Sequence, residues 1–303
     1  MTAAQATARG ERAPQRTSTG HAPHGVFIEL PEMGTCFYRQ YLNPGKPTLL
    51  LLHGMVASSG LNWFRLLPAL QPYFNIIAPD VRGHGRSWPG KGRFSFAAAA
   101  DDAAALIDVL ELGPVIAVGY SMGGAIAQYL CHRHPEKVAG LVLAASNYRA
   151  RIARREELVV LPLFAAMIGV GHFTEIFGHL PKGLLKRFLP KLADQLHDDE
   201  TRWALDEMRR TRIRSVIETG REMMLHDAAD WLHEINVPTA VVVMEKDRAV
   251  PPQHQYEMAE RIRGAELFCY DDGHVACMAT EFGPVLAQAC ASVANRVSGA
   301  ALP

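Results

Sequence analysis

The sequence predicts an α/β protein in which a mostly parallel eight-stranded sheet is flanked by helices and carries an inserted helical cap. Three observations lead to this fold class. Eight short runs of apolar residues recur along the chain, most of them bounded by Gly, Pro or Asp. Segments of helical periodicity separate several of these runs, as in parallel sheets with crossover helices. One long stretch, from about residue 148 to residue 236, shows helical periodicity alone.

The first two apolar runs, at residues 25–30 and 35–41, are separated by the turn residues of the sequence PEMG. This arrangement predicts an antiparallel hairpin, which we place at the edge of the sheet. The other six runs are continuously apolar, as expected of strands that are covered on both faces. They occupy residues 48–53, 74–80, 114–120, 138–145, 238–246 and 265–270.

Two segments between the strands have the apolar spacing of helices. Residues 97–110 repeat apolar side chains at this spacing, and Asp101 and Asp102 lie in the early turns, where the helix dipole favours negative charge. Residues 122–134 form the second segment, and Pro135 ends it because proline cannot continue a helix.

The change from alternating signals to helical signals divides the chain into parts. We expect an α/β core at residues 25–147 and 237–303, a helical cap at residues 148–236, and a disordered tail at residues 1–24. Within the cap, four arginines are interleaved with acidic residues, which predicts a solvated helix face with ion pairs rather than an anion-binding surface. The arginines are Arg209, Arg210, Arg212 and Arg214, and the acidic residues are Asp206, Glu207, Glu218 and Glu222.

The composition excludes several classes of partner. The chain has 31 basic and 31 acidic side chains, so no net field attracts nucleic acid or an anionic membrane surface. Its five cysteines are an odd number without CxxC spacing, which predicts reduced, mostly buried thiols and neither a disulfide framework nor a zinc site. We therefore expect a small-molecule substrate, with no nucleic acid and no metal.

The sequence also predicts a cytoplasmic protein without a membrane span. Residues 1–24 lack the apolar stretch of a secretory signal. The longest apolar segment, residues 158–171, is shorter than the about 20 residues that cross a bilayer. Histidines of the expected cap lack metal-ligand spacing, so we expect surface or packing roles for them and no cofactor. These histidines are His172, His179, His197 and His226.

A serine between glycines follows one apolar run and opens a helical segment, in the sequence Gly119-Tyr120-Ser121-Met122-Gly123. A sharp turn that lifts the serine out of the strand brings backbone segments together, so Gly119 and Gly123 must lack side chains. The free N–H groups of the helix start point at the serine oxygen, which makes the Met122 amide a candidate oxyanion donor. Glycines at such a turn also occur for tight packing alone.

A second oxyanion donor has to come from a neighbouring loop. Residues 48–53 end in His53 and Gly54, and we expect the Met55 amide, directly after them, to be this donor. His53 is expected to shape the loop through hydrogen bonds rather than to act as a base. We expect Met55 and Trp63 to line the entrance of the site, with ordinary packing as the alternative.

The serine also needs a base and an acid that orients the base. His274 follows the last apolar run in a loop that contains glycine, and Asp247 ends the run before it. Both residues are expected at the carboxyl edge of the sheet beside Ser121, where open α/β sheets place their sites. The residues occur in the order serine, acid, histidine along the chain.

Five pieces of sequence carry a resemblance to a known family: HGMVASS, APDVRGHGRS, GYSMGG, EKDRAVPP and DDGHVACM. Over residues 25–297 the chain resembles the α/β-hydrolase fold family, and specifically its capped esterase and lipase-like branch. The resemblance implies Ser121 as nucleophile, Asp247 as acid and His274 as base. It also implies the Met55 and Met122 amides as oxyanion donors. Asp80, Arg82 and His84 are then structural residues of the loop after residues 74–80, with Asp80 and Arg82 holding backbone.

These residues predict a serine hydrolase that cleaves a carboxylic ester through an acyl-enzyme. The apolar residues 158–177 favour a medium-length acyl chain, although they also suit the cap's own core. The same plan is shared by carbon–carbon bond hydrolases of ring-cleavage pathways and by cofactor-free haloperoxidases or perhydrolases. A non-catalytic ligand-binding or signalling protein on this fold is the alternative of another class. The complete set of catalytic residues favours an enzyme.

Overall fold

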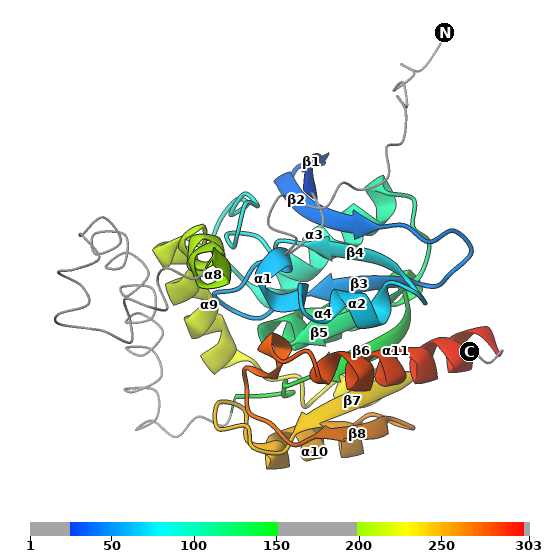
Figure 1. Cartoon of the computed structure of the whole chain (residues 1–303). Coiled ribbons are helices and arrows are strands. Elements are labelled where there is room, and N and C mark those ends of the chain that lie inside the picture. Colours follow the sequence, from blue (N-terminus) through cyan, green and yellow to red (C-terminus); the bar gives the residue numbers. More distant parts are fainter. Residues whose placement is uncertain (1–24, 151–198, 300–303) are drawn as a thin grey trace, which may run out of the picture.

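The structure is a computed structural model that describes residues 25–150 and 199–299. These residues form one sheet of eight strands. The strands are β1 (Gly25–Leu30), β2 (Gly34–Tyr41), β3 (Thr48–Leu52), β4 (Asn75–Pro79), β5 (Val115–Tyr120), β6 (Val138–Ala144), β7 (Thr239–Met244) and β8 (Glu266–Tyr270). Their order across the sheet is β1-β2-β4-β3-β5-β6-β7-β8, as Figure 1 shows.

The pairing confirms the predicted mostly parallel sheet. β1 and β2 form the antiparallel hairpin at one edge, and β2 also pairs antiparallel with β4. All remaining neighbours are parallel, from β4 and β3 through to β7 and β8. The carboxyl ends of these parallel strands therefore meet at one edge, where the loops that follow them converge.

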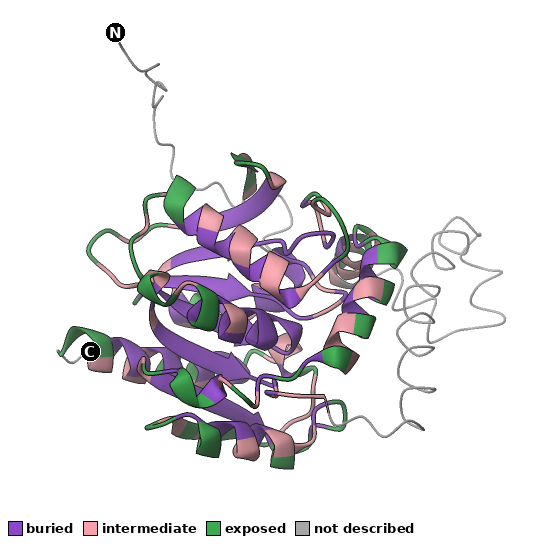
Figure 2. Ribbon diagram, turned by 180° about the vertical axis from the view of Figure 1, so that it is seen from behind, coloured by how far each residue is buried: buried purple, intermediate pink, exposed green. Residues whose placement is uncertain are grey.

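Helices cover both faces of the sheet. One apolar cluster joins the sheet to α3 (Phe96–Val109), α4 (Met122–Arg133) and α10 (Pro252–Arg261). A second cluster joins the other face to α2 (Leu67–Leu70), α11 (Phe282–Ser298) and the side chain of Trp63 in α1 (Ser59–Trp63). In Figure 2 the central strands are buried along their length, while the helices alternate between buried and more exposed residues.

The two predicted helices, at residues 97–110 and 122–134, are confirmed as α3 and α4, and α4 ends before Pro135. Asp101 and Asp102 lie beyond the first turn of α3, so their expected role at the helix dipole is wrong. Their carboxylates instead pair with side chains outside α3, namely those of Arg133, His134 and Arg82.

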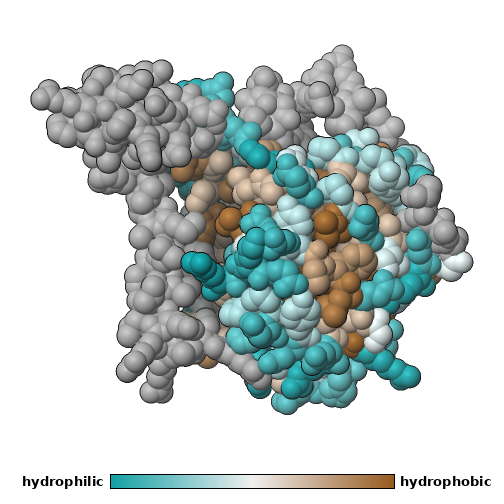
Figure 3. Space-filling model, turned by 60° about the horizontal axis from the view of Figure 1, so that its bottom comes forward, coloured by the Kyte–Doolittle hydropathy of each residue, from teal (hydrophilic) through white to brown (hydrophobic). Residues whose placement is uncertain are grey.

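The expectation that helices bury both faces of every apolar run is wrong for β8. Residues of β8 alternate between half-buried and exposed, and the side chain of Leu267 is 50% exposed. β8 is the outermost strand, and α11 packs against it while α10 packs against β7. Figure 3, which turns the end of the molecule with β8 and α10 forward, shows apolar patches among hydrophilic surface.

Between β6 and β7, the described residues hold α8 (Asp199–Arg209), α9 (Ile213–Leu225) and a short 3-10 helix, η2 (Leu232–Glu234). Residues 199–236 contain no strand, in agreement with their helical periodicity. Figure 1 places α8 and α9 beyond the carboxyl ends of the parallel strands. Residues 1–24 and 151–198 lie outside the described residues, and so do the predicted tail, much of the predicted cap and three of its histidines.

Most of the cysteines are buried, as the sequence predicts. Cys36, Cys131 and Cys290 are buried, Cys277 is partly buried and Cys269 is exposed, and all are free thiols. Among residues 25–150 and 199–299, no helix combines the length and the apolar character that crossing a membrane requires.

Two histidines are buried as neutral packing groups. His226 packs against the rings of Phe96 and Tyr129, and His84 packs against His53 and Phe94. Burial lowers the pKa of His226 to about 4 and that of His84 to about 3. A protonated imidazole is therefore disfavoured in the folded protein at both positions.

We predict that the protein loses stability as the pH falls below 6.5, the ordinary histidine pKa. Between about pH 4 and that value, the unfolded chain binds protons at His226 and His84 that the folded chain rejects. The free energy of unfolding then falls with decreasing pH by up to ~1.4 kcal/mol per unit for each histidine. Urea denaturation at several pH values measures this slope.

The variant His226→Phe keeps an aromatic ring and removes the titrating group, so its stability should depend less steeply on pH. The matched control His233→Gln changes an exposed histidine and should retain the slope of the unmodified protein. An identical slope in His226→Phe and the unmodified protein would contradict the assignment to His226.

Candidate active site

The turn between β5 and α4 holds Ser121 in a strained backbone conformation. Its φ angle is 53°, a left-handed value that residues other than glycine seldom adopt. The Ser121 amide donates to the Ala144 carbonyl over 2.9 Å, and the Ser146 hydroxyl donates to the Ser121 carbonyl over 3.0 Å. These hydrogen bonds to β6 and the residues after it stabilise the turn.

Two glycines allow this turn to form. A Cβ atom added at Gly119 would lie 2.3 Å from the Gly123 carbonyl oxygen. One added at Gly123 would lie 1.9 Å from the carbonyl oxygen of Leu52, at the end of β3. The start of α4 can therefore press against the strand ends only because both residues lack side chains.

The structure brings the side chains of Ser121, His274 and Asp247 into one chain of hydrogen bonds. Ser121 Oγ lies 2.8 Å from His274 Nε2, and His274 Nδ1 lies 2.7 Å from Asp247 Oδ2. When Nδ1 carries the proton and donates it to the carboxylate, Nε2 has the free electron pair that accepts the Ser121 hydroxyl. This is the arrangement that makes a hydroxyl nucleophilic.

Asp247 is fully buried and is held by donors from its own loop. Its Oδ1 accepts the amides of Ala249 and Val250, each over 2.8 Å. Gln255 Nε2 donates to Oδ2 over 3.3 Å and to the Val250 carbonyl over 2.7 Å. Because each oxygen has a donor besides the imidazole, the carboxylate is kept in place for His274.

The loop after β3 lies directly beside Ser121. A Cβ atom at Gly54 would be 3.5 Å from Ser121 Cβ, and the Gly54 amide donates to Asn62 Oδ1 over 2.9 Å. His53 Nδ1 donates to the Gly54 carbonyl over 2.8 Å, and its Nε2 accepts the Val81 amide over 2.9 Å. Both ring nitrogens of His53 thus bind main chain, and burial lowers the pKa of His53.

The two amides named from the sequence belong to the segments that border Ser121. Met122 is the first residue of α4, where helix amides have no acceptor within the helix. Met55 directly follows Gly54 in the loop after β3. Both amides therefore belong to segments next to the Ser121 hydroxyl, from two different elements.

Tyr120 is a site residue that the sequence did not indicate. Its hydroxyl donates to the His274 carbonyl over 2.8 Å and accepts the Cys277 amide over 3.3 Å. The side chain is buried, at 2% exposure. Tyr120 thus ties the loop of His274 to the end of β5, and this partner is too distant in sequence for a local pattern to reveal.

The loop after β4 has a structural role, as expected. Asp80 Oδ1 accepts the Ser59 amide over 2.7 Å, and Oδ2 accepts the Arg86 amide over 2.8 Å. His84 Nδ1 donates to the Arg82 carbonyl over 3.1 Å. For Arg82 the expected contact was wrong, because its guanidinium pairs with the Asp102 carboxylate of α3 rather than with backbone.

Two further expectations about site residues were wrong. Trp63 does not line an entrance, because its side chain is fully buried and packs edge-on against Tyr120 with ring centroids 6.3 Å apart. Glu207 does not belong to a solvated helix face, because it is 1% exposed and pairs with Arg86. Arg209 and Arg214 do form the predicted surface pairs, with Asp206 and Glu218 respectively.

Residues 25–150 and 199–299 contain no cluster of three His, Cys, Asp or Glu side chains that could hold a metal ion.

The fold and the site together define a class of protein. A family profile described as the alpha/beta hydrolase fold matches residues 47–279, which is more than half of the 303 residues. The chain therefore belongs to the alpha/beta hydrolase fold family and is a hydrolase of that superfamily.

Two relatives and a solved structure are similar to this chain along most of their length. A poly(3-hydroxyalkanoate) depolymerase of Ectopseudomonas oleovorans is 29% identical over 84% of this chain and 88% of its own. A pimeloyl-[acyl-carrier protein] methyl ester esterase of Neisseria meningitidis is 32% identical over 72% of this chain and 81% of its own. The enol-lactonase of Burkholderia xenovorans, a solved structure, is 21% identical and superposes with a TM-score of 0.71, covering 88% of this chain and 99% of its own. That structural likeness shows the shared fold.

We predict that Tyr120→Phe lowers kcat for p-nitrophenyl esters by about tenfold while KM changes little. The variant keeps the ring and its packing but loses the hydrogen bonds to the His274 loop, each worth about 1 kcal/mol. Steady-state kinetics measure the effect. Tyr129→Phe, a tyrosine of α4 that packs against Trp231, is the matched control and should retain the unmodified rates. Equal kcat values in both variants would contradict the role of Tyr120.

Proposed function

We propose that the protein is a serine hydrolase that cleaves carboxylic esters through an acyl-enzyme on Ser121. The observation that carries the proposal is the unbroken chain from Ser121 Oγ to His274 Nε2 and from His274 Nδ1 to Asp247, with distances of 2.8 and 2.7 Å. These hydrogen bonds lie where the loops from the carboxyl ends of β5, β7 and β8 converge, which is the usual place for sites in open α/β sheets.

In the first half-reaction, His274 Nε2 takes the Ser121 proton as Oγ attacks the carbonyl carbon of the ester. The resulting oxyanion accepts hydrogen bonds from the Met55 and Met122 amides, a contribution of about 2.7 to 4 kcal/mol for each such donor. Asp247 stabilises the imidazolium and keeps its Nδ1 proton in place. Collapse of the intermediate breaks the ester bond, and the leaving alcohol takes the proton from Nε2.

In the second half-reaction, water attacks the acyl-enzyme. His274 Nε2 accepts a proton from that water, and the tetrahedral intermediate again places its oxyanion at the two amides. Collapse releases the carboxylic acid and returns the proton to Ser121 Oγ. The cycle needs no cofactor.

The acyl group of the substrate is proposed to be of medium length. The proposal is supported by the apolar cluster that Met55 and Val56 of the loop after β3 form with Met208 of α8 and Val216 of α9, which brings apolar side chains to the loop beside Ser121. Residues 148–236 would act as a cap over this edge. The names of the two relatives, which specify a pimeloyl methyl ester and a poly(3-hydroxyalkanoate), support an acyl compound as substrate.

We predict that Ser121→Ala lowers kcat for p-nitrophenyl butyrate by at least about a thousandfold, because the nucleophile is lost while the fold is kept. Steady-state kinetics and labelling by a fluorophosphonate probe measure the effect, and the probe should label the unmodified protein only. The control Ser298→Ala removes a hydroxyl at the end of α11 and should retain full activity. If the unmodified protein is not labelled and hydrolyses the ester no faster than Ser121→Ala, the role of Ser121 is refuted and a non-catalytic binding protein is favoured.

A series of p-nitrophenyl esters from acetate to palmitate tests the acyl length. We predict that kcat/KM rises by up to about fourfold per methylene until the pocket is filled, and then falls. The maximum is expected at a medium-length chain. A steady decrease from acetate onward would contradict the apolar acyl pocket. Higher kcat/KM for a ring-cleavage dienoate, or for bromide oxidation with peroxide, would move the assignment to the alternative reactions of this fold.

A further inference from the structure

The loop that carries the Met55 amide contains a strained residue, in addition to Ser121 in the turn after β5. Val56 has a φ angle of 64°, a left-handed value that is unfavourable for a β-branched side chain. The Ala57 amide donates to the Gly54 carbonyl over 3.3 Å, so the strain lies within a tight turn next to Ser121. Such a conformation persists only where the surrounding structure enforces it.

Contacts from α8 and α9 help to hold Val56 in this conformation. Val56 is 3% exposed, and its side chain packs with Met208 of α8 and Val216 of α9. Ser58, two residues further along the loop, donates its hydroxyl hydrogen bond to Glu207 Oε2 of α8 over 2.6 Å. The same Ser58 oxygen accepts the Leu61 amide and thereby caps α1. α8 therefore contacts the loop through an apolar cluster and through a carboxylate.

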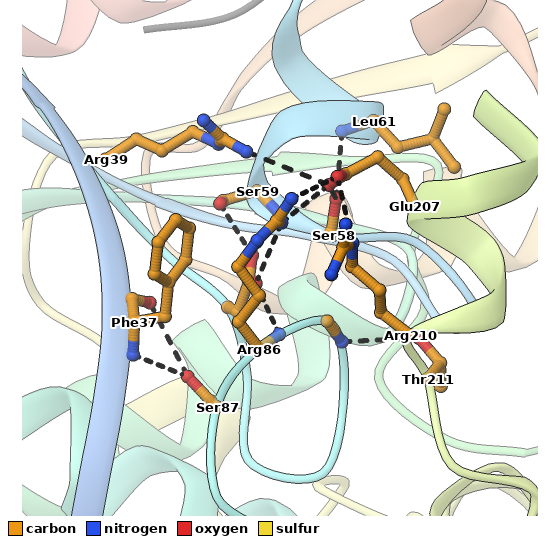
Figure 4. A network of polar contacts seen from close by, with 12 residues as sticks. Phe37, Arg39, Ser58, Ser59, Leu61, Arg86, Ser87, Glu207, Arg210 and Thr211 are labelled. Carbon is orange, nitrogen blue, oxygen red and sulfur yellow. Dashed lines mark hydrogen bonds and ion pairs between the residues drawn. The ribbon is translucent and has the colours of Figure 1, made fainter. Parts of the chain in front are cut away.

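Figure 4 shows that the Glu207 carboxylate is the centre of a polar network between α8 and the core. Arg86 forms a bidentate pair with Glu207, with Nη1 2.9 Å from Oε2. Arg39 Nη2 of β2 lies 3.8 Å from the same oxygen. Asp80 completes the network because its Oδ1 accepts both the amide and the hydroxyl of Ser59, over 2.7 and 2.6 Å.

The ion pairs of this network require that Glu207 is ionised. Burial would raise the pKa of Glu207, but hydrogen bonds from Arg86 and Ser58 and the charges of Arg86 and Arg39 lower it. Arg210 adds a longer contact, with Nε 3.5 Å from Oε1, and is about half exposed. Without the Glu207 charge, Asp80 would be the carboxylate left beside the two largely buried guanidiniums.

We propose that Glu207 is a positioning residue for ester hydrolysis, which fixes the loop of the Met55 amide through Ser58 when α8 is seated on the core. The inference rests on the proposed function. The oxyanion forms only after attack on the carbonyl carbon. A displaced Met55 amide therefore stabilises the transition state less and leaves ground-state binding of the ester almost unchanged. The expected signature is a lower kcat with an unaltered KM.

The variants Glu207→Gln and Ser58→Ala test the proposal, with Asp206→Asn as a matched control. Asp206 precedes Glu207 on α8 and pairs with Arg209 at the surface. We expect kcat for p-nitrophenyl butyrate to fall by about tenfold to a hundredfold in Glu207→Gln, by a smaller factor in Ser58→Ala, and not at all in Asp206→Asn. KM should stay within about twofold in all three variants.

Two further measurements separate positioning from a structural role. An aryl trifluoromethyl ketone, whose adduct with Ser121 carries an oxyanion, should lose affinity for Glu207→Gln by the same factor as kcat, while the acid product should bind unchanged. In the double variant of Glu207→Gln and Ser58→Ala, kcat should fall by less than the product of the two single losses, because both changes break the hydrogen bond between Ser58 and Glu207. A decrease in kcat in the double variant equal to the product of the two single decreases would overturn the proposal.

The outcomes distinguish this inference from the proposed function. If the unmodified protein shows no hydrolysis that depends on Ser121, the proposed function fails and the inference fails with it. If that hydrolysis is present but Glu207→Gln retains kcat, or raises KM alone, only the inference fails. Should Glu207→Gln not fold, Ser58→Ala carries the test, because it leaves the pairs among Glu207, Arg86 and Arg39 in place.

Discussion

The close approach of α4 to the ends of β3 and β5 is the constraint on which the rest of the site depends. The backbone of Gly123 rests against the carbonyl of Leu52, and no residue with a Cβ atom fits there. The tight turn holds Ser121 at a left-handed φ angle of 53°, and α4 begins at the next residue, Met122. The other elements of the site are arranged around this rigid turn.

Buried carboxylates organise the loops that the sheet itself does not hold. Asp247 gathers amides of its own loop and faces the imidazole of His274, Asp80 holds the start of α1, and Glu207 joins α8 to the core. A buried charge without partners is strongly unfavourable, so each carboxylate imposes a definite geometry on the groups around it. The chain thus positions its loops with paired charges as well as with apolar packing.

Much of the fold could be predicted because burial leaves a local pattern in the sequence. Strands covered on both faces require continuous apolar runs, and five of the six runs of this kind, β3 to β7, have the burial expected of them. The pattern was misleading for β8, since an apolar run does not record whether a helix lies over it. Asp102 was assigned to the helix dipole and Glu207 to a solvated helix face for a related reason: helical spacing does not reveal their cationic partners, which are Arg82 and Arg86.

The sequence alone determined the order of the strands along the chain and the turn with its glycines. It also led to Ser121, Asp247 and His274 as candidate catalytic residues, because each of these features leaves its mark within a few neighbouring residues. Only the tertiary structure decided that Tyr120 binds the loop of His274, 154 residues away, and that Glu207 binds Ser58, 149 residues away. Such contacts arise from the packing of distant segments, which no local pattern records.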